Sequence, residues 1–432
     1  MKNKRWLGGI ETFFCIAHDL CRGANNAGML ISIEGPINVD VVKQALYHLY
    51  LRHPLLSATY NKDKKSGRYY FQWSIDFDEI EISLTTADHV ELAAGVAALE
   101  NVINQPYQQG GSLWRVNLLR STGDKPIHYL IFCFHHAIID GISEMRVVKD
   151  FMHYYHAIEN NKIIKTTRLT MPLSLEDCLS TTIKRADYKQ NHQTIIDRYG
   201  FPKELMFEKN VPLLEVSTKI MLCDFEYTRL EKILACSKTH HIKVNSLFIA
   251  ALLLAMQKVT GHTETFMQVA LNVRPYMKPT APHDDLACYI TGVKTIMKNL
   301  DTYDSLLELA QAHQRQYADN FKLSYVPPYD FLTEDKETLL KRISIEPRKQ
   351  FLLGPAISNW GSVTINEEPG TLKINAIHRA TNRQMAESPF YLHIATINQS
   401  IQGAFNYPFP YISQQTMSDI SQTFRQLLNN IS

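Results

Sequence analysis

Short apolar segments typical of buried strands alternate irregularly with amphipathic segments of helical period in both halves of this 432-residue chain. In the first half, Val42, Ala45, Leu46 and Leu49 fall on one face of a predicted helix over Asp40–His53, which Pro54 ends. Further elements are predicted as strands at Leu113–Leu118 and Ile127–Phe134 and as a helix at Ser143–Ile158. The irregular mixture predicts two related α/β (α+β) sandwiches of mixed sheet topology.

The second half repeats the mixture. Strands are predicted at Thr218–Phe225 and Phe266–Val273, and a hairpin at Tyr391–Thr396 with Ile401–Tyr407. The chain closes with an amphipathic helix that carries Met417, Ile420, Phe424, Leu427 and Leu428. Helix starts are predicted from capping residues: Ser143, the capping box Thr228-Arg229-Leu230-Glu231, and Asn245 before a buried helix over Ser246–Lys258.

Between the halves the pattern weakens. Pro172, Pro202 and Pro212 punctuate a polar stretch, so the domain linker is predicted there. The expected organisation is an N-terminal domain over residues 1–170, a linker over 171–212, and a C-terminal domain over 213–432.

Composition excludes several classes of protein. The formal net charge is +2, which gives no sign of a nucleic-acid partner. The seven cysteines are odd in number and form no CxxC pair, which argues against a disulfide framework or a structural zinc site. A reducing cytoplasm is the expected compartment.

The N-terminus begins with a basic run, Met1-Lys2-Asn3-Lys4-Arg5, that is typical of a signal sequence. Glu11, His18 and Asp19 interrupt the segment that follows, so no apolar signal core is present. The longest apolar run, Leu247–Met256, is too short to span a bilayer. We therefore expect a cytoplasmic protein without a transmembrane segment, and a monomer.

The segment that carries chemistry is Phe132-Cys133-Phe134-His135-His136-Ala137-Ile138-Ile139-Asp140-Gly141. An apolar strand delivers two histidines to its end, and a short loop leads through Asp140 and Gly141 into a helix. A histidine that is neutral near pH 7 accepts a proton from a hydroxyl or an amine. Asp140 lies close enough to shape the loop, and Gly141 permits a tight turn that a Cβ would obstruct.

His135 to Gly141 match HHxxxDG, and on this motif the chain resembles the chloramphenicol-acetyltransferase and condensation-domain acyltransferase superfamily. It is most similar to standalone condensation-like or polyketide-associated acyltransferases. Further segments resemble the family's pattern: Arg52-His53-Pro54-Leu55-Leu56, Leu113-Trp114-Arg115-Val116, Asn245–Met256 and Asn272-Val273-Arg274-Pro275. Ser358-Asn359-Trp360-Gly361 stands where the family carries a second motif, and it departs from the form DFGWG.

The resemblance implies a fold and a set of roles. Two chloramphenicol-acetyltransferase-like domains would form a V, with the active site in a tunnel at their interface. His136 would be the general base and His135 would pack beside it. Asp140 would pair with Arg274 and hold the loop that Gly141 ends. Ser358, Asn359 or Trp360 would supply oxyanion donors or line the tunnel.

The implied reaction is transfer of an acyl group from a phosphopantetheine thioester to a hydroxyl or amine acceptor. The donor would be acyl-coenzyme A or an acyl-carrier protein, so an acyl or peptidyl carrier protein is an expected partner. No permanently bound cofactor and no metal are expected.

Several alternatives stay open. His135 and Asp140 also satisfy the HxxxxD spacing of lipid acyltransferases. A catalytically silent condensation-like module would only bind a carrier or partner protein, and a hydrolase would pass the acyl group to water. By spacing alone, His135, His136 and Asp140 could also ligate a metal.

Overall fold

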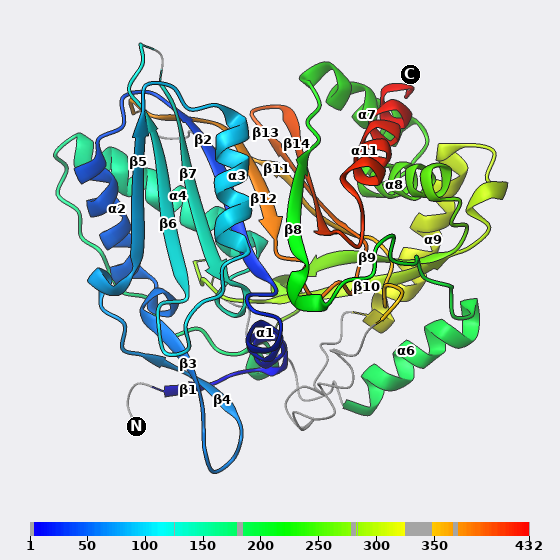
Figure 1. Ribbon diagram of the computed structural model, residues 1–432, viewed down its shortest axis with the longest axis horizontal. Coiled ribbons are helices and arrows are strands. Elements are labelled where there is room, and N and C mark those ends of the chain that lie inside the picture. Colours follow the sequence, from blue (N-terminus) through cyan, green and yellow to red (C-terminus); the bar gives the residue numbers. More distant parts are fainter. Residues whose placement is uncertain are drawn as a thin grey trace.

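Two large mixed sheets and one small sheet organise the chain, with helices packed on their faces (Figure 1). The computed structural model describes residues 4–124, 126–178, 185–277, 282, 284–324, 348–365 and 370–431. The mixed α/β class predicted from the sequence is confirmed, because both large sheets contain parallel and antiparallel pairs.

The first large sheet has the strand order β12-β2-β7-β6-β5. Its strands are β2 (Asn26–Glu34), β5 (Glu81–Ala87), β6 (Trp114–Ser121), β7 (Ile127–His135) and β12 (Lys373–Thr381). Only β5 and β6 pair in parallel; the other neighbours in this sheet are antiparallel. Helices α2 (Val39–Arg52) and α4 (Gly141–Glu159) cover one face, and α3 (Leu92–Ile103) covers the other (Figure 1).

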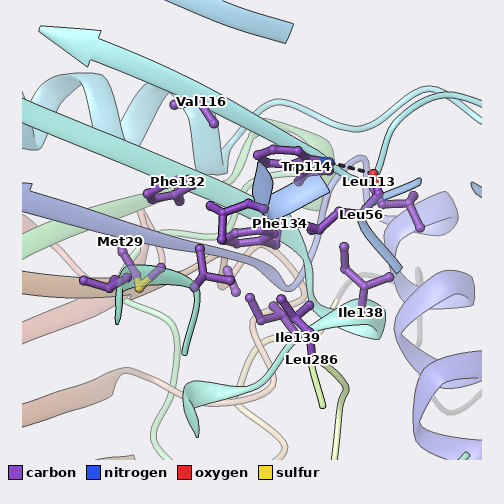
Figure 2. Packing of buried hydrophobic residues seen from close by; sticks show 14 of the residues in the cluster. Met29, Leu56, Leu113, Trp114, Val116, Phe132, Phe134, Ile138, Ile139 and Leu286 are labelled. Atoms are coloured by element: carbon purple, nitrogen blue, oxygen red, sulfur yellow. Dashed lines mark hydrogen bonds between the residues drawn. The ribbon is translucent and has the colours of Figure 1, made fainter. Parts of the chain in front are cut away.

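Side-chain alternation along β7 explains why both faces of this sheet are buried. Phe132 and Phe134 belong to the core cluster that contains residues of α4, whereas Ile131 and Cys133 pack with residues of α3. Figure 2 shows the first of these clusters, with Trp114 stacked near Phe134. The indole Nε1 of Trp114 donates to a backbone carbonyl, Leu56 O, at 2.9 Å, so the buried polar atom is satisfied.

Strand β12 ties the two halves of the chain together. It comes from the second half of the sequence, yet it pairs with β2 at the edge of the first sheet. Two helices, α5 (Leu175–Cys178) and α6 (Arg185–Tyr199), lie within the range that the sequence pattern predicts as a linker.

The second large sheet has the order β10-β9-β11-β13-β14-β8. Its strands are β8 (Ser217–Leu222), β9 (Thr265–Asn272), β10 (Ile290–Met297), β11 (Ala356–Val363), β13 (Tyr391–Ile397) and β14 (Ser400–Phe409). The helices packed with it are α7 (Tyr227–Thr239), α8 (Val244–Thr260), α9 (Leu306–Ser324) and α11 (Gln414–Asn429). The predicted hairpin is confirmed, because β13 and β14 pair antiparallel.

The small sheet lies beside helix α1 (Gly9–Leu20) and has the order β1-β4-β3 (Figure 1). Its strands are β1 (Lys4–Trp6), β3 (Ala58–Lys62) and β4 (Tyr69–Trp73). Among the described residues no single helix is long and apolar enough to cross a membrane, although α7 and α8 together, bent by 106°, meet the length and composition test.

The three predicted helix caps are wrong. Asp140, not Ser143, is the N-cap of α4, and its carboxylate accepts from Ser143 N at 2.9 Å. Helix α7 begins after Glu226 without any side-chain cap, and α8 begins after Lys243. Asn245 is therefore inside α8, where its Oδ1 accepts from Asn359 Nδ2. The side chains of Ser143 and Asn245 bind segments that are distant in the sequence, whereas Glu231 accepts from the Tyr227 hydroxyl of its own helix at 2.7 Å.

Candidate active site

His135 is the last residue of β7, and His136 begins a short turn, His136–Ile138, that leads to α4. The two histidines point to different surroundings. The Nδ1 atom of His135 accepts from Ala137 N at 3.1 Å, and its ring packs 4.7 Å from that of His18 and 5.2 Å from that of Tyr60. His135 is thus enclosed among rings rather than facing the cavity described below.

His136 lines that cavity. Its Nδ1 lies 2.8 Å from the carbonyl oxygen of Ile139. Because a carbonyl only accepts, Nδ1 carries the hydrogen and Nε2 keeps its lone pair. Burial, followed by the nearby charge of Arg379, lowers the pKa of His136 to about 3, so the ring is neutral at pH 7. The imidazole stacks on Phe14 of α1, with ring centroids 4.5 Å apart.

Asp140 faces away from His136 into the contact between the two halves of the chain. Arg274 Nη1 donates to Asp140 Oδ2 at 2.7 Å, which is the contact expected from the resemblance. Tyr289 N donates to the same oxygen at 2.8 Å, and Ser143 N donates to the other. Burial by itself would raise the pKa of Asp140, but Arg274 and the two backbone donors outweigh it and hold the pKa below its ordinary value.

Ser143 extends this network. Its hydroxyl accepts from Ala287 N at 3.0 Å and from Arg274 Nη2 at 2.9 Å, and it donates to Ala287 O at 2.9 Å. The first turn of α4 is therefore fastened to the segment before β10. A buried ion pair of this kind fixes geometry more than it adds stability.

Gly141 touches the second predicted motif. A Cβ atom placed on Gly141 would lie 2.3 Å from Trp360 Nε1. Residue 141 must therefore be glycine because the indole of Trp360 occupies the space, and not because of a positive φ angle.

A cavity of about 240 Å³ opens in front of His136. Its walls come from both halves of the chain: Phe14 of α1, Val269 of β9, Gly292 of β10, Arg379 of β12 and Tyr391 of β13. Pockets that are lined by several elements at a domain contact are the usual place for small-molecule sites.

Arg379 is a site residue that the sequence pattern did not predict. Its Nε donates to the buried carboxylate of Glu144, one turn after Asp140 on α4. Its Nη1 lies 3.1 Å from His393 Nδ1, and Thr381 Oγ1 lies 3.1 Å from His393 Nε2. Burial raises the pKa of Glu144 to about 7. The only sequence signal was the alternation of polar residues along the segment that forms β12.

The three predicted oxyanion residues take separate positions. Ser358 lines the cavity. Asn359 is bonded to Asn245 and accepts from Gly361 N at 2.8 Å, and Trp360 packs against Gly141. Of these three residues, only Ser358 reaches the space in front of His136.

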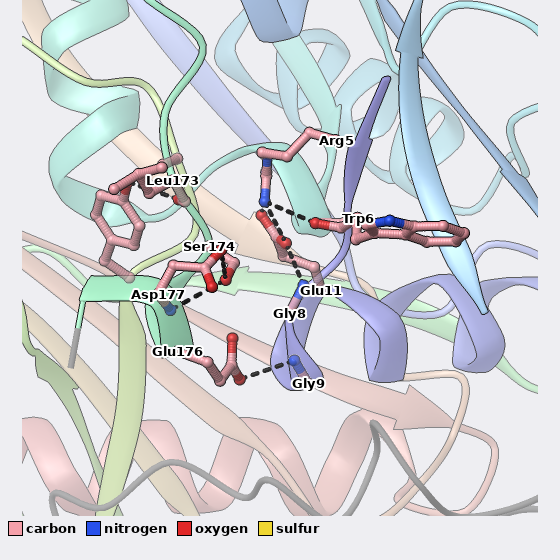
Figure 3. Close-up of polar contacts among 12 residues, drawn as sticks. Arg5, Trp6, Gly8, Gly9, Glu11, Leu173, Ser174, Glu176 and Asp177 are labelled. Carbon is pink, nitrogen blue, oxygen red and sulfur yellow. Dashed lines mark hydrogen bonds and ion pairs between the residues drawn. The ribbon is translucent and has the colours of Figure 1, made fainter. Parts of the chain in front are cut away.

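Helix α1, which carries Phe14, is anchored at its N-terminus by carboxylates (Figure 3). Glu11 accepts from Gly8 N at 2.8 Å and binds Arg5 through both oxygens, at 2.6 and 3.0 Å. Glu176 of α5 accepts from Gly9 N at 2.7 Å. Acidic groups at a helix N-terminus satisfy its free N–H donors and complement its dipole. Burial raises the pKa of Glu176 to about 7.

Metal ligation by His135, His136 and Asp140 does not fit this geometry. His136 Nδ1, His135 Nδ1 and both carboxylate oxygens of Asp140 already have protein partners. Within the described ranges, no group of three or more His, Cys, Asp or Glu side chains could hold a metal ion.

Comparison with known proteins identifies one family. The family model described as Condensation domain matches residues 23–432. A plipastatin synthase protein from Bacillus subtilis (strain 168) is 24% identical over 270 residues, which is 58% of this chain and 10% of that protein. The chain spans a tenth or less of the length of the curated relatives it matches.

Solved structures share the fold at low sequence identity. TRI3, a trichothecene 15-O-acetyltransferase from Fusarium sporotrichioides, superposes with a TM-score of 0.73 at 14% identity, over 98% of this chain and 95% of that one. The first condensation domain of the calcium-dependent antibiotic synthetase, in complex with substrate analogue 2a, gives a TM-score of 0.73 at 11% identity, over 99% and 96%. At these identities the likeness describes the fold alone.

Proposed function

Because this chain belongs to the condensation-domain family, we propose that it transfers an acyl group from a thioester to a hydroxyl or amine, with His136 as the general base. The observation that carries the proposal is the state of His136. Its Nδ1–H is held by Ile139 O, and the ring lines a cavity that both halves of the chain enclose.

Proton transfer follows from this tautomer. The acceptor's O–H or N–H gives its proton to His136 Nε2, and the freed lone pair bonds to the thioester carbonyl carbon. The carbonyl electrons move to oxygen, then return as the carbon–sulfur bond breaks. The departing thiolate takes the proton from His136, so the ring ends the cycle neutral.

Charge develops on the carbonyl oxygen during this step. Arg379 lines the cavity and is held in place by Glu144, and Ser358 contributes a hydroxyl to the same space. Either group could donate a hydrogen bond to the oxyanion, and each is already in position before the reaction begins. Arg379 is the better candidate, because its side chain is buried and a charge acts more strongly there than in water.

For the donor we propose a phosphopantetheine thioester, carried by coenzyme A or by a carrier protein. The named relatives are synthases and synthetases, which supports a carrier-linked donor. The named 15-O-acetyltransferase has the same fold, so this fold is compatible with transfer to a hydroxyl group. A carrier protein would then be a transient partner.

The rival functions fit the geometry less well. An HxxxxD mechanism needs His135 beside Asp140, but His135 packs among His18 and Tyr60 while Asp140 binds Arg274. A silent binding module would not need a neutral histidine facing an enclosed cavity. A hydrolase would use the same base, with water as the acceptor.

The test is a thioester-consumption assay. Purified protein is incubated with a panel of acyl-coenzyme A and acyl-carrier thioesters, with and without small alcohols and amines, and products are read by mass spectrometry. Ester or amide formed only with an acceptor supports the proposal. Release of free acid at the same rate without acceptor would identify a hydrolase, and no consumption of any thioester would overturn the proposal.

A further inference from the structure

Three polar side chains of strand β12 and the turn after it line the cavity in front of His136. Arg379, Thr381 and Arg383 stand at alternating positions, and all three line the space in front of His136. Arg379 forms an ion pair with Glu144. Among the described residues, Arg383 has no such partner.

Arg383 is held by neutral groups. Its Nε donates to Thr381 O at 3.3 Å, and its Nη2 donates to Asn25 Oδ1 at 3.3 Å, both long for charged donors. The guanidinium lies 4.4 Å from the ring centroid of Tyr391. In the part of the chain that the structure describes, Arg383 forms no ion pair and its Nη1 has no acceptor. A partly buried cation that lacks an ion-pair partner favours a bound anion.

The surrounding charges also favour an anion. Arg379 and Lys294 line the same cavity as Arg383, and Glu387 is the one carboxyl group among the described lining residues. Burial raises the pKa of Glu387, and the charges of Arg348, Arg383 and Lys294 act against this rise. Burial also lowers the pKa of Arg383, while Tyr391 and Glu387 act against this fall.

We propose that Arg383 binds a carboxylate of the acceptor, so that the acceptors are small hydroxy acids or amino acids with a free carboxyl group. This inference rests on the proposed acyl transfer. The planar fork of an arginine matches a carboxylate through two parallel hydrogen bonds. A cavity of about 240 Å³ suits a molecule of amino-acid size. A pantetheine phosphate is a poorer candidate, because it lies at the far end of the arm from the thioester.

Binding without any donor tests the inference directly. A panel of small α-hydroxy acids and amino acids, each paired with its own primary amide, is titrated into the protein by calorimetry. We expect at least one acid to bind about tenfold or more tightly than its amide, as a charge-assisted pair requires. Arg383→Gln should abolish that difference, and Arg383→Lys, which keeps the charge but loses the fork, should retain part of it.

Arg425→Gln is the matched control, because Arg425 is exposed on α11. It should leave the preference for acids unchanged. Circular dichroism and thermal melts establish that each variant is folded. If no acid binds more tightly than its amide, or if folded Arg383→Gln keeps the full preference, the inference is overturned. Preferential binding of inorganic phosphate over every acid would also overturn it.

A second experiment tests the carboxylate site separately from the proposed acyl transfer on which it rests. The same acids and amides are offered as acceptors in the thioester-consumption assay. Equal transfer to acids and amides would contradict the carboxylate site while leaving acyl transfer intact. Transfer to acids alone, lost in Arg383→Gln but not in Arg425→Gln, supports both.

Discussion

Trp360 Nε1 lies 2.3 Å from the position that a Cβ on Gly141 would take, so the start of α4 and strand β11 are fitted to each other at this point. The glycine of the motif is thus explained by a contact with a residue far away in the sequence. Trp360 also lies near Arg379, whose guanidinium is 5.6 Å from its ring centroid.

Gly141→Ala should therefore destabilise the protein by about 1–3 kcal/mol through overpacking, and lower thioester consumption. Trp360→Leu removes the obstructing indole, so the double variant should be more stable than the sum of the two single losses predicts. Urea unfolding of the four proteins measures this. Strictly additive losses would show that the close contact does not account for the glycine.

The buried pair between Asp140 and Arg274 gives a second prediction. Asp140→Asn or Arg274→Gln leaves one buried charge without its partner and should cost about 3–5 kcal/mol. The double variant should lose less than the sum, because neither charge is then stranded. If the double variant loses as much free energy of unfolding as the two single variants together, the two side chains do not stabilise each other.

Replacement of Phe14 should change the pH profile of kcat/KM. Phe14→Leu keeps an apolar side chain but removes the stacked ring, which lets water approach His136. The pKa of His136 should then rise towards its ordinary value of about 6.5, so the acid limb of kcat/KM moves to higher pH. Thermal melts should shift little. A lower rate with an unmoved acid limb would mean that Phe14 acts only through packing.

Replacement of Glu176 should change how the free energy of unfolding depends on pH. The pKa of Glu176 in the folded state, about 7, is raised above the ordinary value of 4.5. Its contribution to the free energy of unfolding is therefore fully present below pH 4.5 and is lost as the pH rises through 7. Glu176→Gln imitates the protonated carboxyl group and still accepts from Gly9 N. Its free energy of unfolding should match wild type near pH 4.5 and exceed it at pH 8. A difference that does not vary with pH would contradict the raised pKa.

The sequence predicts those parts of the fold and site that local patterns specify. Strand β7, the motif at its end and helix α4 follow from apolar period and residue order, and Arg274 follows from the family resemblance. Phe14, Arg379 and Arg383 could not be predicted, because only the pairing of β12 with β2 and the packing of α1 bring them to His136. Two of the cap predictions are wrong for the same reason: Ser143 and Asn245 bind segments that are distant in the sequence.

The central claim is that His136 removes the acceptor's proton. The most direct measurement is the single-turnover rate of thioester consumption, with a saturating acceptor, in wild type, His136→Ala and the control His89→Ala, which replaces an exposed histidine. The account predicts a loss of about 10²–10⁴ in rate for His136→Ala that is still folded at the assay temperature, and no loss for His89→Ala. Turnover near the wild-type rate in folded His136→Ala would contradict it.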